Sequence, residues 1–234
     1  MTEMKLAIVG YGRMGRLVEA LAPEYGVSVK LRLDSKNNAS SRALTKEQLT
    51  GIDAAIQFST PRAAPENIVQ LVRAGIPTIC GTTGWYDQLA SVRAMVDDAG
   101  GALVWGANFS VGVCLFSQIV SEAARLLATQ PEYGAWAWEI HHAAKKDAPS
   151  GTLLTLVARM KEAGYARPID TGSNRAGLQP GTHEIGFDSP SDTITLRHVA
   201  RNREGFARGA LRAAAWIAGK KGVFEFQDII GELK

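Results

Sequence analysis

The stretch Lys5-Leu6-Ala7-Ile8-Val9-Gly10-Tyr11-Gly12-Arg13-Met14-Gly15 decides the fold of the first half of this chain. Its apolar start predicts a strand over residues 5–9, and the three glycines form a Gly-x-Gly-x-x-Gly turn. A helix is expected from this turn to about Ala22, where Pro23 stops it. A second strand, Val27–Leu33, ends at Asp34, about 20 residues beyond the turn. This order of strand, glycine turn, helix and acid is typical of a dinucleotide-binding unit.

Each glycine of the turn has a physical reason. Gly10 makes the tight turn, Gly12 lets the backbone approach a pyrophosphate, and Gly15 lets the helix pack closely on the strand. The phosphates would lie against the N–H groups of the helix start, and Asp34 would accept hydrogen bonds from the adenosine ribose. Asp34 repels a 2′-phosphate, which favours NADH, although Lys36 and Arg13 could pair with one, so NADPH stays open. The alternative is a glycine-rich turn without a ligand.

The alternation of strands and helices continues along the chain. Strands are expected over 53–58, 77–80 and 102–105, with helices over about 63–74 and 88–99. This alternation predicts a parallel sheet covered on both faces. Small and hydroxyl residues follow the three strands, at 58–61, 81–84 and 107–110. Ligands of such sheets bind at the carboxyl ends of the strands, so together these segments favour one cofactor groove, although each alone fits ordinary turn chemistry.

The pattern changes after Asn108. A long apolar helix is expected over about 111–128, strands over 134–141, 183–188 and 193–200, and a helix over 152–163. Alternating and aromatic strand patterns indicate a mixed or antiparallel sheet, and the last helix and strand, 208–219 and 223–227, are expected to rejoin the first domain. The predicted fold class is therefore α/β, with a Rossmann-type parallel-sheet cofactor domain over 1–108 and 208–234. Residues 109–207 would form an α+β domain with a mixed sheet.

The most unusual stretch runs Glu139-Ile140-His141-His142-Ala143-Ala144-Lys145-Lys146-Asp147-Ala148-Pro149-Ser150-Gly151-Thr152. Ser150 or Thr152 can cap the following helix, whose first N–H groups would bind a carboxylate. Nearby Lys or His side chains would add charge-assisted hydrogen bonds, and His141 can exchange a proton near neutral pH. The alternative is a capped helix after a solvated basic loop. No metal is expected, because adjacent histidines point apart on a strand and no cysteine or acid cluster completes a ligand set.

This stretch resembles the signature of dihydrodipicolinate reductases, Glu-x-His-His-x-x-Lys-x-Asp-Ala-Pro-Ser-Gly-Thr. Further segments resemble motifs of the same family, and together they extend the resemblance over nearly the whole chain: Gly12–Gly15, Gly81–Gly84, Ala107–Gly112, Arg175-x-Gly177 through Gly181-x-His183, and Phe206–Ala210. The resemblance implies reduction of a cyclic hydroxy-tetrahydrodipicolinate with loss of water, by hydride transfer from a nicotinamide, in the diaminopimelate route to lysine. It also implies a homotetramer built through the sheet of the second domain, which would bind the substrate.

The resemblance also implies roles for single residues. His141 would be the proton donor or acceptor and Lys145 a second proton donor. The dicarboxylate substrate would be held by His142, Ser150, Gly151 and Thr152. The cofactor would be bound by Gly10, Tyr11, Gly12, Arg13, Met14, Gly15, Asp34, Gly81, Thr82, Thr83, Gly106, Ala107, Asn108 and Phe109. Ser35 stands where the family often has an arginine, which weakens the case for NADPH. Thr60 stands where a basic residue is common, which weakens the case for a side-chain contact with the cofactor there.

Composition and charge exclude several other classes. With 26 basic and 23 acidic residues, 46% hydrophobic residues and no patch of alternating basic and aromatic residues, the chain is a globular protein without a nucleic-acid surface. No apolar run reaches the roughly 18 residues of a membrane span. Two cysteines and an N-terminus without signal-peptide order predict a cytoplasmic protein. Two other functions stay open: a related NAD-dependent amino-acid or hydroxy-acid dehydrogenase, such as an aspartate dehydrogenase, and a nicotinamide-sensing module without turnover.

Overall fold

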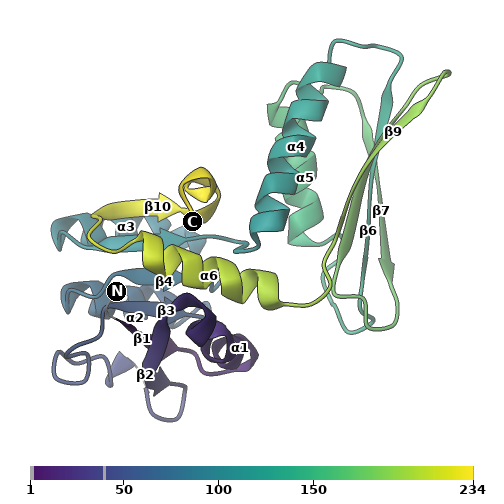
Figure 1. Cartoon of the computed structure of the whole chain (residues 1–234). Coiled ribbons are helices and arrows are strands. Elements are labelled where there is room, and N and C mark those ends of the chain that lie inside the picture. Colours follow the sequence, from purple (N-terminus) through teal and green to yellow (C-terminus); the bar gives the residue numbers. More distant parts are fainter. Residues whose placement is uncertain (1–2, 39–40, 234) are drawn as a thin grey trace. The chain divides into compact units, whose positions relative to one another are not determined.

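A computed structural model describes residues 3–38 and 41–233, and the chain divides into two compact units (Figure 1). The first unit extends to Val111 and resumes at Glu204, and the second comprises Gly112–Arg203. Among the described residues, no helix combines the length and the apolar character that a membrane crossing needs.

The first unit is a parallel sheet of six strands in the order β10-β5-β4-β3-β1-β2. Its strands are β1 (Met4–Val9), β2 (Val27–Leu33), β3 (Ala54–Gln57), β4 (Thr78–Cys80), β5 (Ala102–Trp105) and β10 (Gly222–Glu225). Its helices are α1 (Arg13–Leu21), α2 (Ala64–Arg73), α3 (Leu89–Asp98) and α6 (Glu204–Trp216). The chain passes from β1 outward to β2 and then returns to β3 on the other side of β1. The strand order therefore reverses between β1 and β3, the position at which such sheets bind ligands.

Burial explains why the central strands are continuous apolar runs. Leu6, Ala7 and Ile8 of β1 are all 0% exposed, because helices cover both faces of the sheet (Figure 1). Helix α1 packs with α6 and α2 packs with α3. Each fully buried Leu or Ile contributes roughly 1.5–3 kcal/mol, which makes this sheet a rigid support for the loops at its edge.

The second unit is a mixed four-stranded sheet in the order β7-β6-β8-β9, with two helices on one face (Figure 1). Its strands are β6 (Gly134–His141), β7 (Ile169–Arg175), β8 (Thr182–Asp188) and β9 (Thr193–Val199), and its helices are α4 (Val111–Leu127) and α5 (Gly151–Glu162). β6 runs parallel to β7 and antiparallel to β8, and β8 runs antiparallel to β9. Phe116 and Val120 of α4 and Leu153 and Leu156 of α5 pack in a core with the inner face of the sheet.

The predicted fold class, a parallel Rossmann-type sheet together with a mixed-sheet α+β unit, is confirmed. One strand was missed, because β7 reads Ile-Asp-Thr-Gly-Ser-Asn-Arg and has no apolar alternation. This strand forms an edge of the sheet, so most of its side chains are exposed or half-buried. The last helix also begins at Glu204, four residues before the predicted Arg208. Helix α5 begins at Gly151, directly after its cap Ser150.

Candidate active site

A pocket of about 910 Å³ opens beyond the carboxyl ends of β1, β2 and β3, next to the point where the strand order reverses. Each of these strands contributes the residues at its end: Val9 and Gly10, Leu33 and Asp34, and Phe58 and Ser59. The rest of the lining is Tyr11, Gly12, Ser35, Asn38, Ser41, Thr60, Arg62, Ala63, Glu66 and Asn67. The first unit thus has a concave site where a doubly wound sheet binds its ligand.

The glycine loop has the close approaches that its spacing predicts. Gly10 has φ +99°, and a Cβ there would lie 2.1 Å from the Phe58 carbonyl oxygen. A Cβ at Gly15 would lie 2.5 Å from the Gly10 carbonyl oxygen, so the missing side chain lets α1 start against β1. Gly12 is different, because a Cβ there would meet no described atom within 4 Å. Its bare backbone borders open space at the start of α1, as a phosphate site requires.

The remaining loop residues divide between the pocket and the helix. Tyr11 lines the pocket, and its hydroxyl donates to Glu19, which also accepts from Arg32 at 2.8 Å. The hydrogen bond to Glu19 raises the pKa of the Tyr11 hydroxyl. Arg13 and Met14 form the first turn of α1 and are not among the described residues that line the pocket.

Asp34 lies at the end of β2 on the pocket wall. Its Oδ1 accepts from the N–H groups of Lys36 at 2.8 Å and Asn37 at 3.2 Å, and its own N–H donates to Asn37 Oδ1 at 2.7 Å. These contacts hold the carboxylate in a fixed turn beside Ser35. The side chain is therefore placed to meet a ligand that enters the pocket.

The later loop residues lie outside the described lining of this pocket. Thr82 is buried and its Oγ1 accepts from the Ser59 N–H at 2.8 Å, which ties the loop after β4 to the loop after β3. Phe109 is 1% exposed and packs 4.4 Å, centroid to centroid, from Phe226. Its side chain therefore belongs to the core, and only its backbone is left for a ligand. The other predicted residues of these loops, Gly81, Thr83, Gly106, Ala107 and Asn108, follow β4 and β5 directly.

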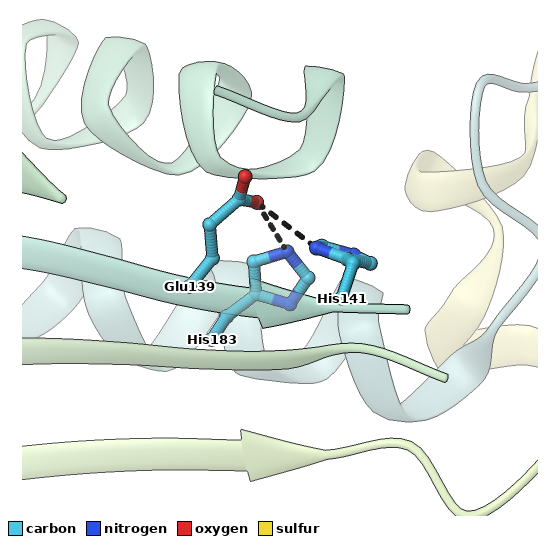
Figure 2. A group of neighbouring side chains, drawn as sticks. All are labelled: Glu139, His141 and His183. Atoms are coloured by element: carbon cyan, nitrogen blue, oxygen red, sulfur yellow. Dashed lines mark ion pairs between the residues drawn. The ribbon is translucent and has the colours of Figure 1, made fainter. Parts of the chain in front are cut away.

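In the second unit, Glu139, His141 and His183 converge on the inner face of the sheet (Figure 2). Glu139 and His141 lie two residues apart on β6, so their side chains share a face, and His183 is the register partner of Glu139 on β8. Oε2 of Glu139 lies 3.5 Å from His141 Nδ1 and 3.4 Å from His183 Nε2. The two imidazole rings meet edge to face with 5.1 Å between centroids.

Glu139 is 0% exposed, and its carboxylate is surrounded by donors. Oε1 accepts from the Ser150 N–H at 2.8 Å, the Ser173 hydroxyl at 3.0 Å and Arg175 at 2.8 Å, and the Ser150 hydroxyl donates to Oε2. Burial raises the pKa of this carboxyl, but the hydrogen bonds from Ser150 and Arg175 outweigh it and hold the pKa below its ordinary value. Glu139 is thus a buried carboxylate whose charge Arg175 balances.

The surroundings of both histidines lower their pKa values and so favour the neutral imidazole. Burial lowers the pKa of His141, the Glu139 charge opposes this, and Lys145 and Arg175 reinforce it. Burial, together with the neighbouring His141, lowers the pKa of His183 to about 4. A neutral imidazole can accept a proton and return it, whereas a permanently charged one cannot.

Lys145 lies in the loop between β6 and α5. Its ammonium group donates to both carboxylate oxygens of Asp147 at 2.8 Å. This hydrogen bond lowers the pKa of Asp147, and the Gly151 N–H adds to the effect. The Lys145 side chain is 23% exposed and that of Asp147 is 57% exposed, so the pair faces solvent at the start of α5.

The four residues predicted to hold the substrate have different surroundings. Ser150 is 2% exposed and caps α5, with its Oγ accepting from the Leu153 N–H at 3.2 Å. Gly151 is exposed and begins the helix, and Thr152 follows it half-buried. His142 lies just beyond β6 and is half-buried, and its carbonyl accepts from the Lys145 N–H at 3.0 Å. His142 is not part of the group around Glu139.

Contrary to the expectation that no acid completes a ligand set, Glu139 lies beside two histidines. Glu139, His141 and His183 each offer one ligand atom, and these atoms lie within 4.8 Å of one another. The register of β6 and β8 creates this set, and it could not be read from adjacent histidines. The donor set fits a metal poorly, however, because Ser150, Ser173 and Arg175 already satisfy the carboxylate and Arg175 balances its charge.

Sequence reasoning also gave no role to Glu139, Ser173, Arg175 or His183. The alternation of a strand could have placed Glu139 beside His141. Ser173 and Arg175 lie on the strand that was missed, so no sequence pattern indicated that they pair with β6 at Glu139 and His141.

Comparison with known proteins covers both units. Residues 4–109 match the family model described as dihydrodipicolinate reductase, N-terminus, and residues 112–230 match that of dihydrodipicolinate reductase, C-terminus. A 4-hydroxy-tetrahydrodipicolinate reductase of Christiangramia forsetii is 33% identical, over 98% of this chain and 99% of the relative. One of Ralstonia nicotianae is 32% identical, over 97% of this chain and 100% of the relative. The structure of dipicolinate-bound dihydrodipicolinate reductase from Paenisporosarcina sp. TG-14 has the same fold, with a TM-score of 0.78 and 22% identity, over 97% of this chain and 99% of that one.

Proposed function

This chain belongs to the dihydrodipicolinate reductase family, and we propose that it reduces 4-hydroxy-tetrahydrodipicolinate to tetrahydrodipicolinate, with loss of water, in lysine biosynthesis through diaminopimelate. The chain is accordingly an oxidoreductase. The observation that carries the proposal is the near full-length similarity to reductases of this name. The buried cluster of Glu139, His141 and His183 in the second unit supports it.

The first unit is proposed to bind the nicotinamide cofactor, and the second to bind the substrate. The open backbone at Gly12 and the fixed carboxylate of Asp34 suit a pyrophosphate and a ribose in the 910 Å³ pocket. The bound nicotinamide supplies the hydride. The carboxylate of Asp34 on the pocket wall would repel a 2′-phosphate, which supports NADH over NADPH.

The second unit is proposed to donate the proton that the reaction requires. Hydride addition to the substrate ring leaves the neighbouring ring carbon in need of a proton. His141, whose pKa is lowered by burial, releases a proton readily once it carries one, and the ammonium group of Lys145 is a second donor. The exposed start of α5 at Gly151 and Thr152 and the half-buried His142 would hold the substrate carboxylates. Ser150 would contribute indirectly, because it caps α5 and donates hydrogen bonds to Glu139.

We further propose a homotetramer built through the outer face of the second sheet. Trp136, Trp138 and Ile140 alternate with the core-facing residues of β6 and so lie on the face opposite α4 and α5. The indole of Trp136 packs on Gly186, its register partner, where a Cβ would approach the indole to 2.1 Å. Half-buried aromatic residues on the open face of a sheet favour contact with a second protein surface. Light scattering of the purified protein would test the assembly. Because Cys80 and Cys114 are buried thiols, we also propose a reducing, cytoplasmic location.

A coupled assay tests the proposed function. The preceding synthase of the lysine route generates the substrate, and the absorbance of NADH is followed after the protein is added. Oxidation well above the rate without the protein is expected. Folded protein that oxidises neither NADH nor NADPH above background would refute the reductase and favour a sensing module, and turnover only with amino or hydroxy acids would favour a related dehydrogenase.

A further inference from the structure

The proposed reaction leaves the buried carboxylate of Glu139 without a role. We propose that Glu139 is a positioning residue, which orients the ring of His141 and supplies the negative charge that this ring needs while it carries the transferred proton. The proposal rests on the proposed function, because it assigns Glu139 a part in the same site.

The two oxygens of Glu139 have different surroundings. Oε1 accepts from Ser150, Ser173 and Arg175, which hold the carboxylate in place from β7 and from the start of α5. Oε2 accepts from the Ser150 hydroxyl and also faces the two histidines, and the two dashed contacts of Figure 2 meet at this oxygen. Ser150 thus anchors both oxygens, and of the two it is Oε2 that lies within reach of His141.

The contact between Glu139 and His141 is suited to the protonated ring. His141 Nδ1 is buried and has no hydrogen-bond partner in the described part of the chain, although Oε2 is only 3.5 Å away. A buried ring nitrogen without a partner is costly, and a proton on it would allow a charge-assisted bond to Oε2. Catalytic hydrogen bonds are often long in the absence of substrate and shorten when the charge develops.

Arg175 pairs with Glu139 and opposes a positive charge on His141. It lies on β7 as the register partner of His141, its side chain is 17% exposed, and it donates to Oε1 at 2.8 Å. Lys145 and Asp147, from the loop before α5, also act on the charge of His141. His183 on β8 lies beside His141, and His198 on β9 is in turn a neighbour of His183. Arg175 and Lys145 oppose a charge on His141, and Glu139 and Asp147 favour it.

This arrangement predicts that removing the charge of Glu139 and removing the charge of Arg175 shift the titration of His141 in opposite directions. The titration of His141 is measured by NMR of isotope-labelled histidines in protein without ligands, with the signal identified by its loss in His141→Gln. Glu139→Gln should move the titration to lower pH, and Arg175→Met should move it to higher pH. A structural role for the pair would disturb the site in the same way in both variants. Titrations that move together, or not at all, would overturn the proposal.

Kinetics give a second test. Glu139→Gln should lower kcat about 10-fold or more, with unchanged cofactor affinity, and shift the pH–rate profile in the direction of the His141 titration. Glu122→Gln, which removes an exposed partner of Arg125 on α4, is the control and should leave kcat unchanged.

A double variant separates positioning from folding, because Glu139→Gln alone leaves Arg175 without its counter-charge. Glu139→Gln/Arg175→Met removes both charges, so it should regain most of the lost Tm while kcat stays low. Recovery of kcat in the double variant would show that Glu139 only balances Arg175, and would overturn the proposal. If the wild type lacks reductase activity, the proposed function falls, and the titrations still decide the role of Glu139.

Discussion

Ser150 joins the start of α5 to Glu139 on β6. Its hydroxyl donates to Oε2 of Glu139 and accepts from the Leu153 N–H at 3.2 Å, while its own N–H donates to Oε1 at 2.8 Å. A single residue therefore caps a helix and holds the carboxylate that faces His141. The stability of the second unit and the geometry of its site depend on the same contacts.

Ser150→Ala should lower the free energy of unfolding by about 2 kcal/mol or more, because it removes the helix cap and leaves Glu139 Oε2 without its donor. Urea denaturation measures the change. Thr155→Ala is the control, since the Thr155 hydroxyl only donates to the Gly151 carbonyl at 2.9 Å on the exposed side of α5, and it should change stability by less than about 0.5 kcal/mol. Equal effects of the two substitutions would contradict a special role for Ser150.

Gly10 and Gly12 should respond differently to alanine. Gly10→Ala places a Cβ 2.1 Å from the Phe58 carbonyl oxygen at φ +99° and should destabilise the protein by about 2 kcal/mol or more. Gly12→Ala extends into open space, so Tm should stay near the wild type while the Kd for the dinucleotide rises about 10-fold. Calorimetry measures both quantities. A Gly12→Ala protein with unchanged cofactor affinity would place the pyrophosphate elsewhere.

Acid should destabilise the protein through its buried histidines. The pKa of His183 is about 4 in the folded state and 6.5 in the unfolded chain, so the unfolded chain binds more protons between these values. The contribution of His183 to the free energy of unfolding is therefore fully present above about pH 6.5. It is lost as the pH falls toward 4, by up to about 3 kcal/mol. Urea denaturation at pH 7.5, 6 and 5 should show this loss, and His183→Gln should reduce it. An equally steep loss in His183→Gln would assign the effect to other groups.

NADH should be used at least as efficiently as NADPH, because Asp34 lies where a 2′-phosphate would approach the pocket and would repel it. Initial rates with each cofactor give the two values of kcat/KM. An efficiency more than tenfold higher with NADPH would contradict this prediction and would direct attention to Lys36, Arg13 and Arg62 as phosphate ligands.

The glycine turn could be predicted in full from the sequence because its constraints are local. A tight turn, a close helix and an acid at the next strand end each depend on a few neighbouring residues, and the structure places Gly10, Gly12, Gly15 and Asp34 as expected. The strands of the first unit were recognisable because burial on both faces makes them continuously apolar.

The cluster of Glu139, His141 and His183 could be predicted only in part, because strand pairing assembles it. His141 stood out through its neighbours in sequence, but His183 reaches Glu139 through the antiparallel register of β6 and β8. Arg175 comes from β7, an edge strand whose polar, glycine-containing sequence gives no periodic signal. Phe109, expected at the cofactor, has its side chain buried against Phe226, and a loop sequence does not reveal which side chain turns into the core.

The most direct test of the account compares the wild type with His141→Gln and Lys145→Ala in the coupled reaction, with cofactor binding measured separately. Proton transfer by these two side chains predicts that each variant loses about 100-fold or more in kcat while its NADH affinity stays near that of the wild type. A His141→Gln protein that turns over at the wild-type rate, or a Lys145→Ala protein impaired only in KM, would contradict it.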